Sequence, residues 1–232
     1  MTRDGACEKN RQAVRLLFDR KEKQATRPLY EQAFGDGAAY VDYYYREKCR
    51  DNVIAVKTEA PADTLLSMAH LNPYLFSVCG AIVRSYMVAA VATDAGRRRE
   101  GHMRDVLQAA FAFMAEQGVP FAVLLPVDPA IYTPFGFETV CAFTEKEPAQ
   151  KTLAERYDIY TVRDLAAKRR RAMEQALDEA GSEDEGWPAD PVIMARVTDA
   201  AAFDAMAGRS FQNDAERLAW LKSKRICISD GV

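Results

Sequence analysis

Residues 86–103 constrain this chain more than any other stretch, because they combine a strand, a basic turn and the start of a helix. Tyr86 to Ala92 is an apolar run typical of a buried strand, and the turn composition Thr93-Asp94-Ala95-Gly96 follows it. Three arginines and Gly101 come next, and the run from Met103 to Glu116 is amphipathic. The first turn of a helix presents unpaired N–H groups and the positive end of the helix dipole. The stretch therefore predicts a phosphate-binding site.

The arginine run Arg97-Arg98-Arg99 has an alternative interpretation as a solvated charge cluster. A basic cluster at a helix N-terminus is unfavourable to the helix dipole unless an anion binds there. Because Gly101 also allows the backbone to approach a ligand closely, we favour the phosphate site.

Two motifs carry a resemblance to a known family. Arg98-Arg99-Glu100-Gly101-His102-Met103 fits the pattern Arg/Gln-x-x-Gly-x-Gly/Ala, with Met103 in place of the last small residue. Further along the chain, Tyr132-Thr133-Pro134-Phe135-Gly136-Phe137 fits Tyr-x-x-x-Gly-Phe, and Pro120 to Pro126 between them has the composition of a strand. Over roughly residues 27–145 the chain resembles the Gcn5-related N-acetyltransferases. With His70-Leu71-Asn72-Pro73-Tyr74 it most resembles a bacterial subgroup that is similar to the N-terminal domain of enhanced-intracellular-survival acetyltransferases.

This resemblance implies a fold, a cofactor and a set of binding residues. The fold is an α/β (α+β layered) domain, with a mixed, mostly antiparallel central sheet flanked by helices and a C-terminal helical and strand appendage. The co-substrate is acetyl-CoA, with no metal. The implied cofactor-binding residues are Val91, Ala92 and Thr93 for the pantetheine arm, and Arg98, Arg99, Glu100, Gly101, His102 and Met103 for the pyrophosphate. Met103 takes more room than the family's small residue, which affects the fine geometry of the turn.

The resemblance implies that Tyr132 is the catalytic residue. A phenol has an ordinary pKa of about 10, so it is protonated at neutral pH and can donate a proton to a departing thiolate. The alternative is a tyrosine that only packs beside Phe135 and Phe137. The general base stays open: His70, His102, Asp94 and Glu100 are candidates, as is a chain of water molecules.

Composition excludes several classes of protein. The net charge of −3 argues against a nucleic-acid or anionic-membrane partner and mildly favours a cationic substrate. No apolar run is long enough to span a bilayer, and the charged N-terminal segment lacks the apolar core of a signal peptide, so we expect a cytoplasmic protein. Cysteines stand singly, without a Cys-x-x-Cys pair, so neither a zinc site nor a disulfide framework is indicated. We expect Cys79 and Cys141 to be core residues.

The sequence divides into four predicted regions. The first is an N-terminal extension (1–26) with a helical patch from Ala13 to Phe18, and the second is an acetyltransferase domain (27–147). A helix with an acidic linker (148–190) and a C-terminal appendage or remnant of a further domain (191–232) follow. The last region holds too much apolar surface for water and too little chain for its own core. We therefore expect it to dock on the catalytic domain or on a second subunit, so a homo-oligomer stays open.

Element by element, the patterns predict helices and strands around one sheet. The helices are expected on either side of Gly35-Asp36-Gly37, over Met103 to Gln117, over Leu165 to Ala180 and over Ala200 to Met206. The strands are expected over Asn52 to Lys57, Thr64 to His70, Tyr74 to Val83, Tyr86 to Ala92, Phe121 to Leu125, Phe137 to Thr144 and Pro191 to Val197. The tyrosines from Tyr40 to Tyr45 either border the acceptor site or pack in the core.

Together these observations predict an acetyl-CoA-dependent N-acetyltransferase acting on a primary amine of a small molecule or peptide. A catalytically degenerate fold that binds acyl-CoA or a partner protein is the alternative. The sequence does not name the acceptor amine.

Overall fold

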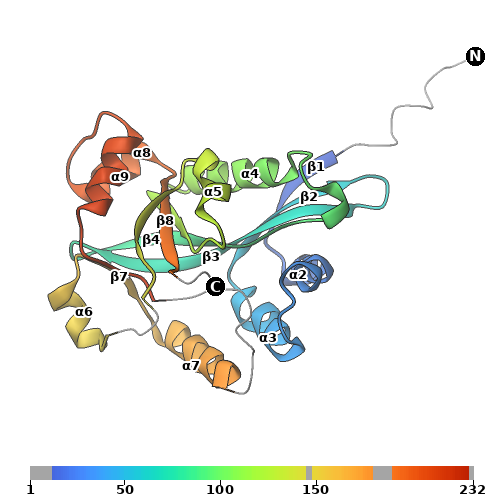
Figure 1. Ribbon diagram of the computed structural model, residues 1–232, viewed down its shortest axis with the longest axis horizontal. Helices are drawn as coiled ribbons and strands as arrows, with labels where there is room; N and C mark the ends of the chain where they lie inside the picture. The colour runs from blue at the N-terminus through green and yellow to red at the C-terminus, as the bar shows by residue number, and fades with distance from the viewer. Residues whose placement is uncertain (1–11, 145–147, 180–189, 230–232) are drawn as a thin grey trace, which may run out of the picture. The chain divides into compact units, whose positions relative to one another are not determined.

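The computed structural model describes residues 12–144, 148–179 and 190–229, and it has a mixed α/β architecture (Figure 1). Within these ranges nine strands form one sheet, in the order β1-β2-β3-β4-β5-β8-β6, with β7 beside β3 and β9 beside β7. The β4–β5 and β7–β9 pairs are parallel, and the β1–β2, β2–β3, β3–β7, β5–β8 and β6–β8 pairs are antiparallel. The predicted mixed, mostly antiparallel sheet flanked by helices is confirmed.

The strands are β1 (Gln12–Leu17), β2 (Val53–Glu59), β3 (Thr64–Val78), β4 (Ala81–Thr93), β5 (Phe121–Leu124), β6 (Glu138–Ala142), β7 (Ile159–Val162), β8 (Val192–Val197) and β9 (Ile226–Cys227). The α-helices are α1 (Arg20–Lys23), α2 (Arg27–Phe34), α3 (Ala38–Tyr43), α4 (His102–Glu116), α5 (Pro129–Tyr132), α6 (Gln150–Arg156), α7 (Leu165–Glu179), α8 (Ala200–Ala207) and α9 (Asp214–Lys222). Shorter elements are the 3₁₀ turns η1 (Gln24–Thr26), η3 (Ala95–Arg97) and η4 (Thr133–Phe135), and the π-helical turn η2 (Tyr44–Lys48).

The chain divides into two compact units, and strands β3 and β4 contribute to both. The first unit contains residues 1–72 and 90–112, and the second contains residues 73–89 and 113–232, each as far as it is described. The basic turn predicted from the sequence belongs to the first unit, and the segment around Tyr132 belongs to the second.

In the first unit, α2 and α3 cover one side of β2 and β3, and the start of α4 lies on the other side (Figure 1). The core beneath α2 and α3 is apolar and aromatic, and Tyr44 and Tyr45 are fully buried in it. Gly35 ends α2 in a left-handed conformation (φ +67°), which an L-residue with a side chain rarely adopts, so two helices form where one continuous helix would otherwise run. The predicted helix pair is confirmed, and the tyrosine cluster is core.

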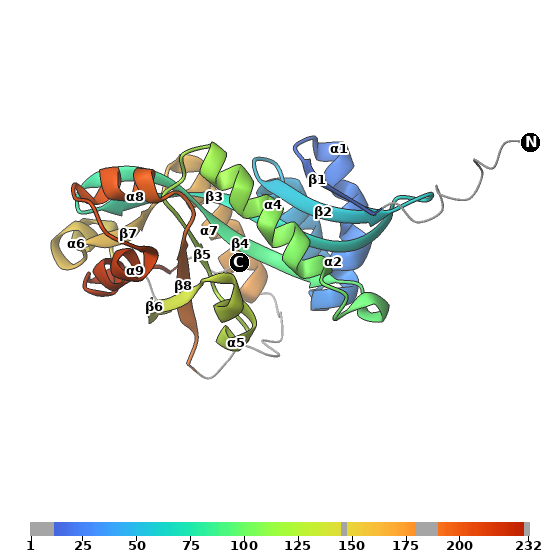
Figure 2. The same ribbon diagram turned by 90° about the horizontal axis from the view of Figure 1, so that it is seen from above.

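In the second unit, the core is built from β5, β8, α8 and α9. Phe121, Val123, Ile193 and Phe203 are buried in it. Helices α8 and α9 lie side by side (Figure 2), and the rings of Phe203 and Trp220 meet edge to face with centroids 5.9 Å apart.

The C-terminal segment contributes β8 to the interior of the sheet. This strand pairs antiparallel with β5 on one side and with β6 on the other. The segment that the sequence indicates as an appendage therefore carries a strand between two strands of the preceding region. Burial of both faces explains why its residues from Val192 to Val197 are almost uniformly apolar.

Two predicted elements are wrong. Ala13 to Phe18 is not helical: β1 pairs antiparallel with β2 along its whole length, because the free edge of β2 offers a complete row of backbone partners. The predicted break at Asn72-Pro73 is absent, and β3 runs unbroken through it. Proline lacks a backbone N–H, but Pro73 falls between the β2 ladder, which ends at Leu71, and the β7 ladder, which begins at Leu75.

The chain instead reverses after β3 at Cys79 and Gly80, which have φ values of +49° and +90°. Cys79 is consequently exposed, and its predicted core position is wrong, whereas Cys141 is half-buried. The predicted acidic linker around Ser182 to Gly186 and the first part of the N-terminal extension lie outside the described residues. No helix in the described ranges is both long and apolar enough to cross a bilayer.

Candidate functional site

The basic turn joins β4 to α4 within the first unit. Asp94 begins it, because its Oδ1 accepts a hydrogen bond from the Gly96 N–H at 2.9 Å and closes the turn η3. Arg99 and Gly101 both adopt left-handed backbone conformations, with φ values of +69° and +86°. The left-handed region is unfavourable for arginine and open to glycine, so the chain accepts strain at Arg99 to make this turn. No atom lies within 4 Å of where a Cβ on Gly101 would stand.

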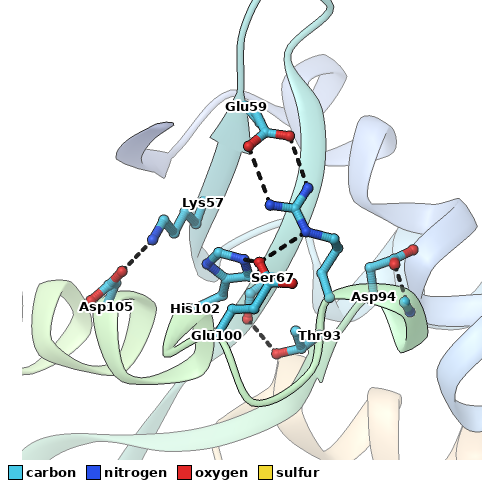
Figure 3. A network of polar contacts seen from close by, with 10 residues as sticks. Lys57, Glu59, Ser67, Thr93, Asp94, Glu100, His102 and Asp105 are labelled. Atoms are coloured by element: carbon cyan, nitrogen blue, oxygen red, sulfur yellow. Dashed lines mark hydrogen bonds and ion pairs between the residues drawn. The ribbon is translucent and has the colours of Figure 1, made fainter. Parts of the chain in front are cut away.

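The three consecutive arginines of the turn have different environments. Arg97 forms a two-pronged ion pair with Glu59, with Nη1–Oε2 and Nη2–Oε1 distances of 2.8 and 3.2 Å, and its Nε donates to Glu100 Oε2 at 3.0 Å (Figure 3). These hydrogen bonds raise the pKa of Arg97 further above its usual value. Arg98 and Arg99 are exposed, and neither forms an ion pair within the described part of the chain.

His102 is the first residue of α4, and its ring is buried although the turn around it is exposed. Its Nε2 lies 3.1 Å from Oε2 of Glu100, the same oxygen that accepts from Arg97 (Figure 3). Its Nδ1 is buried and has no hydrogen-bond partner among the described residues. The side chains of Glu100 and His102 therefore contact each other, which leaves their backbone groups as the parts that could reach a ligand.

A second ion pair holds the first turn of α4 against β2. Lys57 Nζ contacts Asp105 Oδ2, and the Lys57 side chain is almost fully buried. Lys57 and Glu59 are two residues apart on β2 and point to the same side, as alternate residues of a strand do. Strand β2 thus holds both η3 and α4.

The end of β4 approaches this turn with irregular backbone. Ala90 has a φ of +46°, which interrupts the extended geometry inside the strand. The ladder between β4 and β5 contains only the pairs Tyr86↔Ala122 and Met87↔Val123, and β4 continues to Thr93 beyond it. Ala92 is buried and Val91 is half-buried.

Ser67 fixes the end of β4 from the neighbouring strand. Its Oγ donates to the Ala92 carbonyl at 2.8 Å and lies 2.9 Å from Thr93 Oγ1 (Figure 3). The Asp94 N–H donates to the Leu66 carbonyl at 2.9 Å. The backbone on both sides of Thr93 is therefore held in one position.

Tyr132 is the last residue of α5 in the second unit. Asp128 caps this short helix by accepting from the Ala130 N–H, and Pro134 follows in a 3₁₀ turn. The ring of Tyr132 meets Phe137 edge to face with centroids 6.1 Å apart. The side chain is half-buried, and burial raises the pKa of Tyr132 to about 12. Because this pKa lies well above 7, the phenol keeps its proton at neutral pH, and its hydroxyl has no hydrogen-bond partner within the described ranges.

Gly136 shapes the turn after Tyr132. It has a φ of +79°, and a Cβ on it would lie 2.5 Å from Nη1 of Arg196 on β8. The same Nη1 donates to the Phe135 carbonyl. A glycine is therefore required at position 136 for two reasons: the left-handed backbone conformation and the lack of space for a side chain.

The general-base candidates have different settings. His70 is fully buried on β3, with Nδ1 3.2 Å from the Tyr44 hydroxyl, and burial lowers the pKa of His70 to about 3. Asp94 is occupied in capping the turn. Among the described residues no group of histidine, cysteine and acidic side chains is arranged to hold a metal ion.

The sequence predicted the turn but missed the residues that hold it. Glu59, Ser67 and Lys57 lie on β2 and β3, far from the motif in the chain, and only their polar character inside strands hints at a role. Arg97 was assigned to the same basic run as its neighbours, because residue type alone does not show which arginine has a carboxylate partner.

Comparison with protein families gives one matching model, described as "Acetyltransferase (GNAT) domain", over residues 13–140. The match begins inside β1 and ends inside β6, so it includes the basic turn and the segment of Tyr132. None of the curated proteins matches the sequence of this chain significantly.

Several solved structures share the fold. The Escherichia coli GNAT family N-acetyltransferase YhbS, in complex with CoA, aligns over 90% of this chain and 91% of its own at 17% identity, with a TM-score of 0.53. Eis1 from Mycobacterium abscessus aligns over 74% of this chain and 49% of its own at 15% identity, also with a TM-score of 0.53.

A conserved protein of unknown function from Enterococcus faecalis V583 aligns over 57% of this chain at 18% identity, with a TM-score of 0.52. This chain spans about a third of the length of that protein, since the alignment covers 33% of it. At these identities the likeness concerns the fold.

Proposed function

The chain belongs to the GNAT acetyltransferase family, and from this we propose that it transfers an acetyl group from acetyl-CoA to a primary amine. The observation that carries the proposal is the turn from Arg98 to Met103, where two exposed arginines, without an ion pair among the described residues, and a left-handed glycine come before a 15-residue helix.

The donor set of this turn fits a pyrophosphate. The first N–H groups of α4 have no partner within the helix, and the helix dipole adds positive potential there. Arg98 and Arg99 supply two exposed cations, and the space beside Gly101 is open for close approach of a ligand. Glu100 would oppose an anion, and its contact with Arg97, which also pairs with Glu59, offsets only part of that negative charge. Arg98, Arg99 and the backbone from Glu100 to Met103 are the groups that we expect to hold CoA.

Bound acetyl-CoA supplies the acetyl group as a thioester, and the residues of this chain position it. The fixed backbone from Val91 to Thr93 offers N–H and carbonyl groups along which an extended arm can bind like an added strand. Backbone N–H groups in such a position stabilise negative charge on a carbonyl oxygen.

Tyr132 holds the proton that the leaving sulfur requires. Its hydroxyl is protonated throughout the neutral range because burial raises its pKa to about 12. A fully protonated phenol can serve as a general acid, and its raised pKa makes it a weaker acid than an exposed tyrosine.

The acceptor is proposed to be an amine because that is the chemistry of N-acetyltransferases, and the net charge of −3 favours cationic compounds. YhbS and Eis1 share the fold but are too distant in sequence to indicate an acceptor.

A thiol-release assay tests the proposed function. The full chain is incubated with acetyl-CoA and a panel of amines: polyamines, aminoglycosides, amino-acid amides and peptides with a free N-terminus or lysine. We expect free thiol only when both acetyl-CoA and one class of amine are present. Binding of CoA by calorimetry without thiol release from any amine would instead indicate a degenerate acyl-CoA-binding module, and absence of CoA binding would contradict both.

A further inference from the structure

We propose that Glu59 is a positioning residue for CoA binding, which acts by holding Arg97 and through it the anion-binding turn. This inference rests on the proposed function. Glu59 is the last residue of β2 and lies 38 positions before Arg97 in the chain, outside both sequence motifs. No ligand contact is required of it.

The Glu59–Arg97 pair has the geometry of a specific clamp. Both carboxylate oxygens of Glu59 accept from separate guanidinium nitrogens of Arg97, which fixes the plane and direction of the guanidinium group. The Glu59 side chain is 16% exposed and that of Arg97 is 31% exposed, so solvent screens this pair less than an ordinary surface pair. A lysine could not reproduce the two-pronged contact.

Further side-chain contacts connect the Glu59–Arg97 pair to both ends of the turn. The third nitrogen of the Arg97 guanidinium, Nε, donates to Glu100, and Glu100 contacts the ring of His102. Arg97 is the last residue of η3 and His102 is the first of α4. The chain Glu59–Arg97–Glu100–His102, called the brace below, therefore spans the segment that contains the two left-handed residues Arg99 and Gly101 (Figure 3).

The brace also determines which arginines can meet an anion. Arg97 faces two carboxylates, so its charge is already balanced, and Arg98 and Arg99 are left to bind a phosphate. Removing the charge of Glu59 would release Arg97 from β2, and Glu100, which Arg97 and His102 still hold, would no longer be fixed relative to that strand. The affinity for CoA would fall, whereas α4 would stay attached to β2 through Lys57 and Asp105.

The test measures CoA affinity by calorimetry for the full chain and for Glu59→Gln, Arg97→Ala and the double variant. Glutamine keeps the shape of Glu59 and removes its charge. We expect each single substitution to weaken CoA binding by about 3- to 30-fold, the range found for residues that act on a site through a neighbour. We expect the double variant to bind no more weakly than Arg97→Ala, because both substitutions break the same clamp.

Asp158→Asn is the matched control. Asp158 also forms a two-pronged pair with an arginine, Arg225, but in the second unit, where Asp158 directly precedes β7 and Arg225 directly precedes β9. This substitution should leave CoA affinity unchanged. Thermal unfolding of each variant without ligand shows whether it is folded.

Hydrogen exchange of the ligand-free protein tests whether the brace stabilises the turn, and this measurement does not depend on CoA. We expect the amides from Arg98 to Met103 to exchange faster in Glu59→Gln than in the wild type, and no such change in Asp158→Asn. Unaltered exchange and unaltered CoA affinity in folded Glu59→Gln would overturn the inference. A loss of CoA affinity in Arg97→Ala but not in Glu59→Gln would also overturn it, because Arg97 would then contact the ligand directly.

If the wild-type chain binds no CoA, the proposed function fails. Faster exchange in Glu59→Gln would then show that the brace stabilises the turn without a role in CoA binding.

Discussion

Single residues of one type have different roles in this molecule because their neighbours differ. Arg97 is bound by two carboxylates, whereas Arg98 and Arg99 beside it are exposed and form no ion pair in the described ranges. The same holds for the tyrosines: Tyr44 is fully buried in the core of the first unit, and Tyr132 is half-buried with a hydroxyl that no described residue binds. Environment rather than residue type assigns these roles.

Tyr132 gives the first prediction. We expect Tyr132→Phe to lower the turnover rate by about 10²- to 10⁴-fold, the usual contribution of a general acid, with little change in acetyl-CoA affinity. In the wild type, ionisation of Tyr132 should not lower turnover below about pH 11, since its pKa is about 12. Steady-state kinetics and calorimetry measure both quantities. A turnover rate equal to wild type would show that another group donates the proton, and a large loss of affinity would mark Tyr132 as a binding residue.

His70 gives a prediction on stability. Burial lowers the pKa of His70 to about 3, against about 6.5 in an unfolded chain. Between these values the unfolded chain binds a proton that the folded chain does not, so acid favours unfolding. Titration of His70 therefore does not change the free energy of unfolding above pH 6.5. As the pH falls toward 3, protonation of His70 in the unfolded chain lowers that free energy by at most ~1.4 kcal/mol per pH unit.

Denaturant unfolding of the wild type and of His70→Phe across pH 4 to 8 measures this contribution. We expect the free energy of unfolding to fall less steeply with acid in the variant. Phenylalanine suits the site sterically, because the His70 ring lies among the rings of Tyr30, Tyr44 and Tyr45. Parallel curves for the two proteins would mean that His70 is protonated in the folded state.

At the scale of elements, periodicity and glycines predicted more than local propensity did. Helix α4 was expected over Met103 to Gln117, and it runs from His102 to Glu116. The long strand β3 was missed because Asn72-Pro73 is a turn signal in isolation. Pro73 falls between the two separate ladders on β3, so its missing N–H interrupts no hydrogen bond of either ladder. Strand β1 was missed for a similar reason: its partner β2 lies far away in the sequence.

The turn between α5 and β6 gives a prediction at this scale. Gly136→Ala would force alanine into a left-handed conformation and place its Cβ 2.5 Å from Arg196 Nη1. Gly208→Ala is a matched control, since Gly208 has a φ of +66° but no atom within 4 Å of its Cβ position. We expect the control to lose about 1–2 kcal/mol of unfolding free energy and Gly136→Ala to lose more. Equal losses, measured by chemical denaturation, would show that Arg196 moves aside without cost.

For the molecule as a whole, the sequence indicated the family and the two motif segments but not what supports them. Arg98 to Met103 and Tyr132 could be proposed from the sequence because each motif is contiguous in the chain. Glu59, Lys57 and Ser67 were not, because they reach the turn from β2 and β3 and no local pattern links them to it. The role of β8 was missed because sheet order depends on pairings between distant segments, and a strand pattern near the C-terminus does not show its neighbours.

The central claim is that the turn from Arg98 to Met103 binds the CoA pyrophosphate, and calorimetric titration of acetyl-CoA into Gly101→Val tests it most directly. Gly80→Val is the control: Gly80 has nearly the same φ, +90° against +86°, and equally open surroundings, but lies in the β3–β4 hairpin. Both variants carry backbone strain of about 1–3 kcal/mol, so they should be similarly destabilised. We predict that Gly101→Val loses acetyl-CoA affinity severely and that Gly80→Val keeps it. Wild-type affinity in folded Gly101→Val would contradict the assignment of the turn.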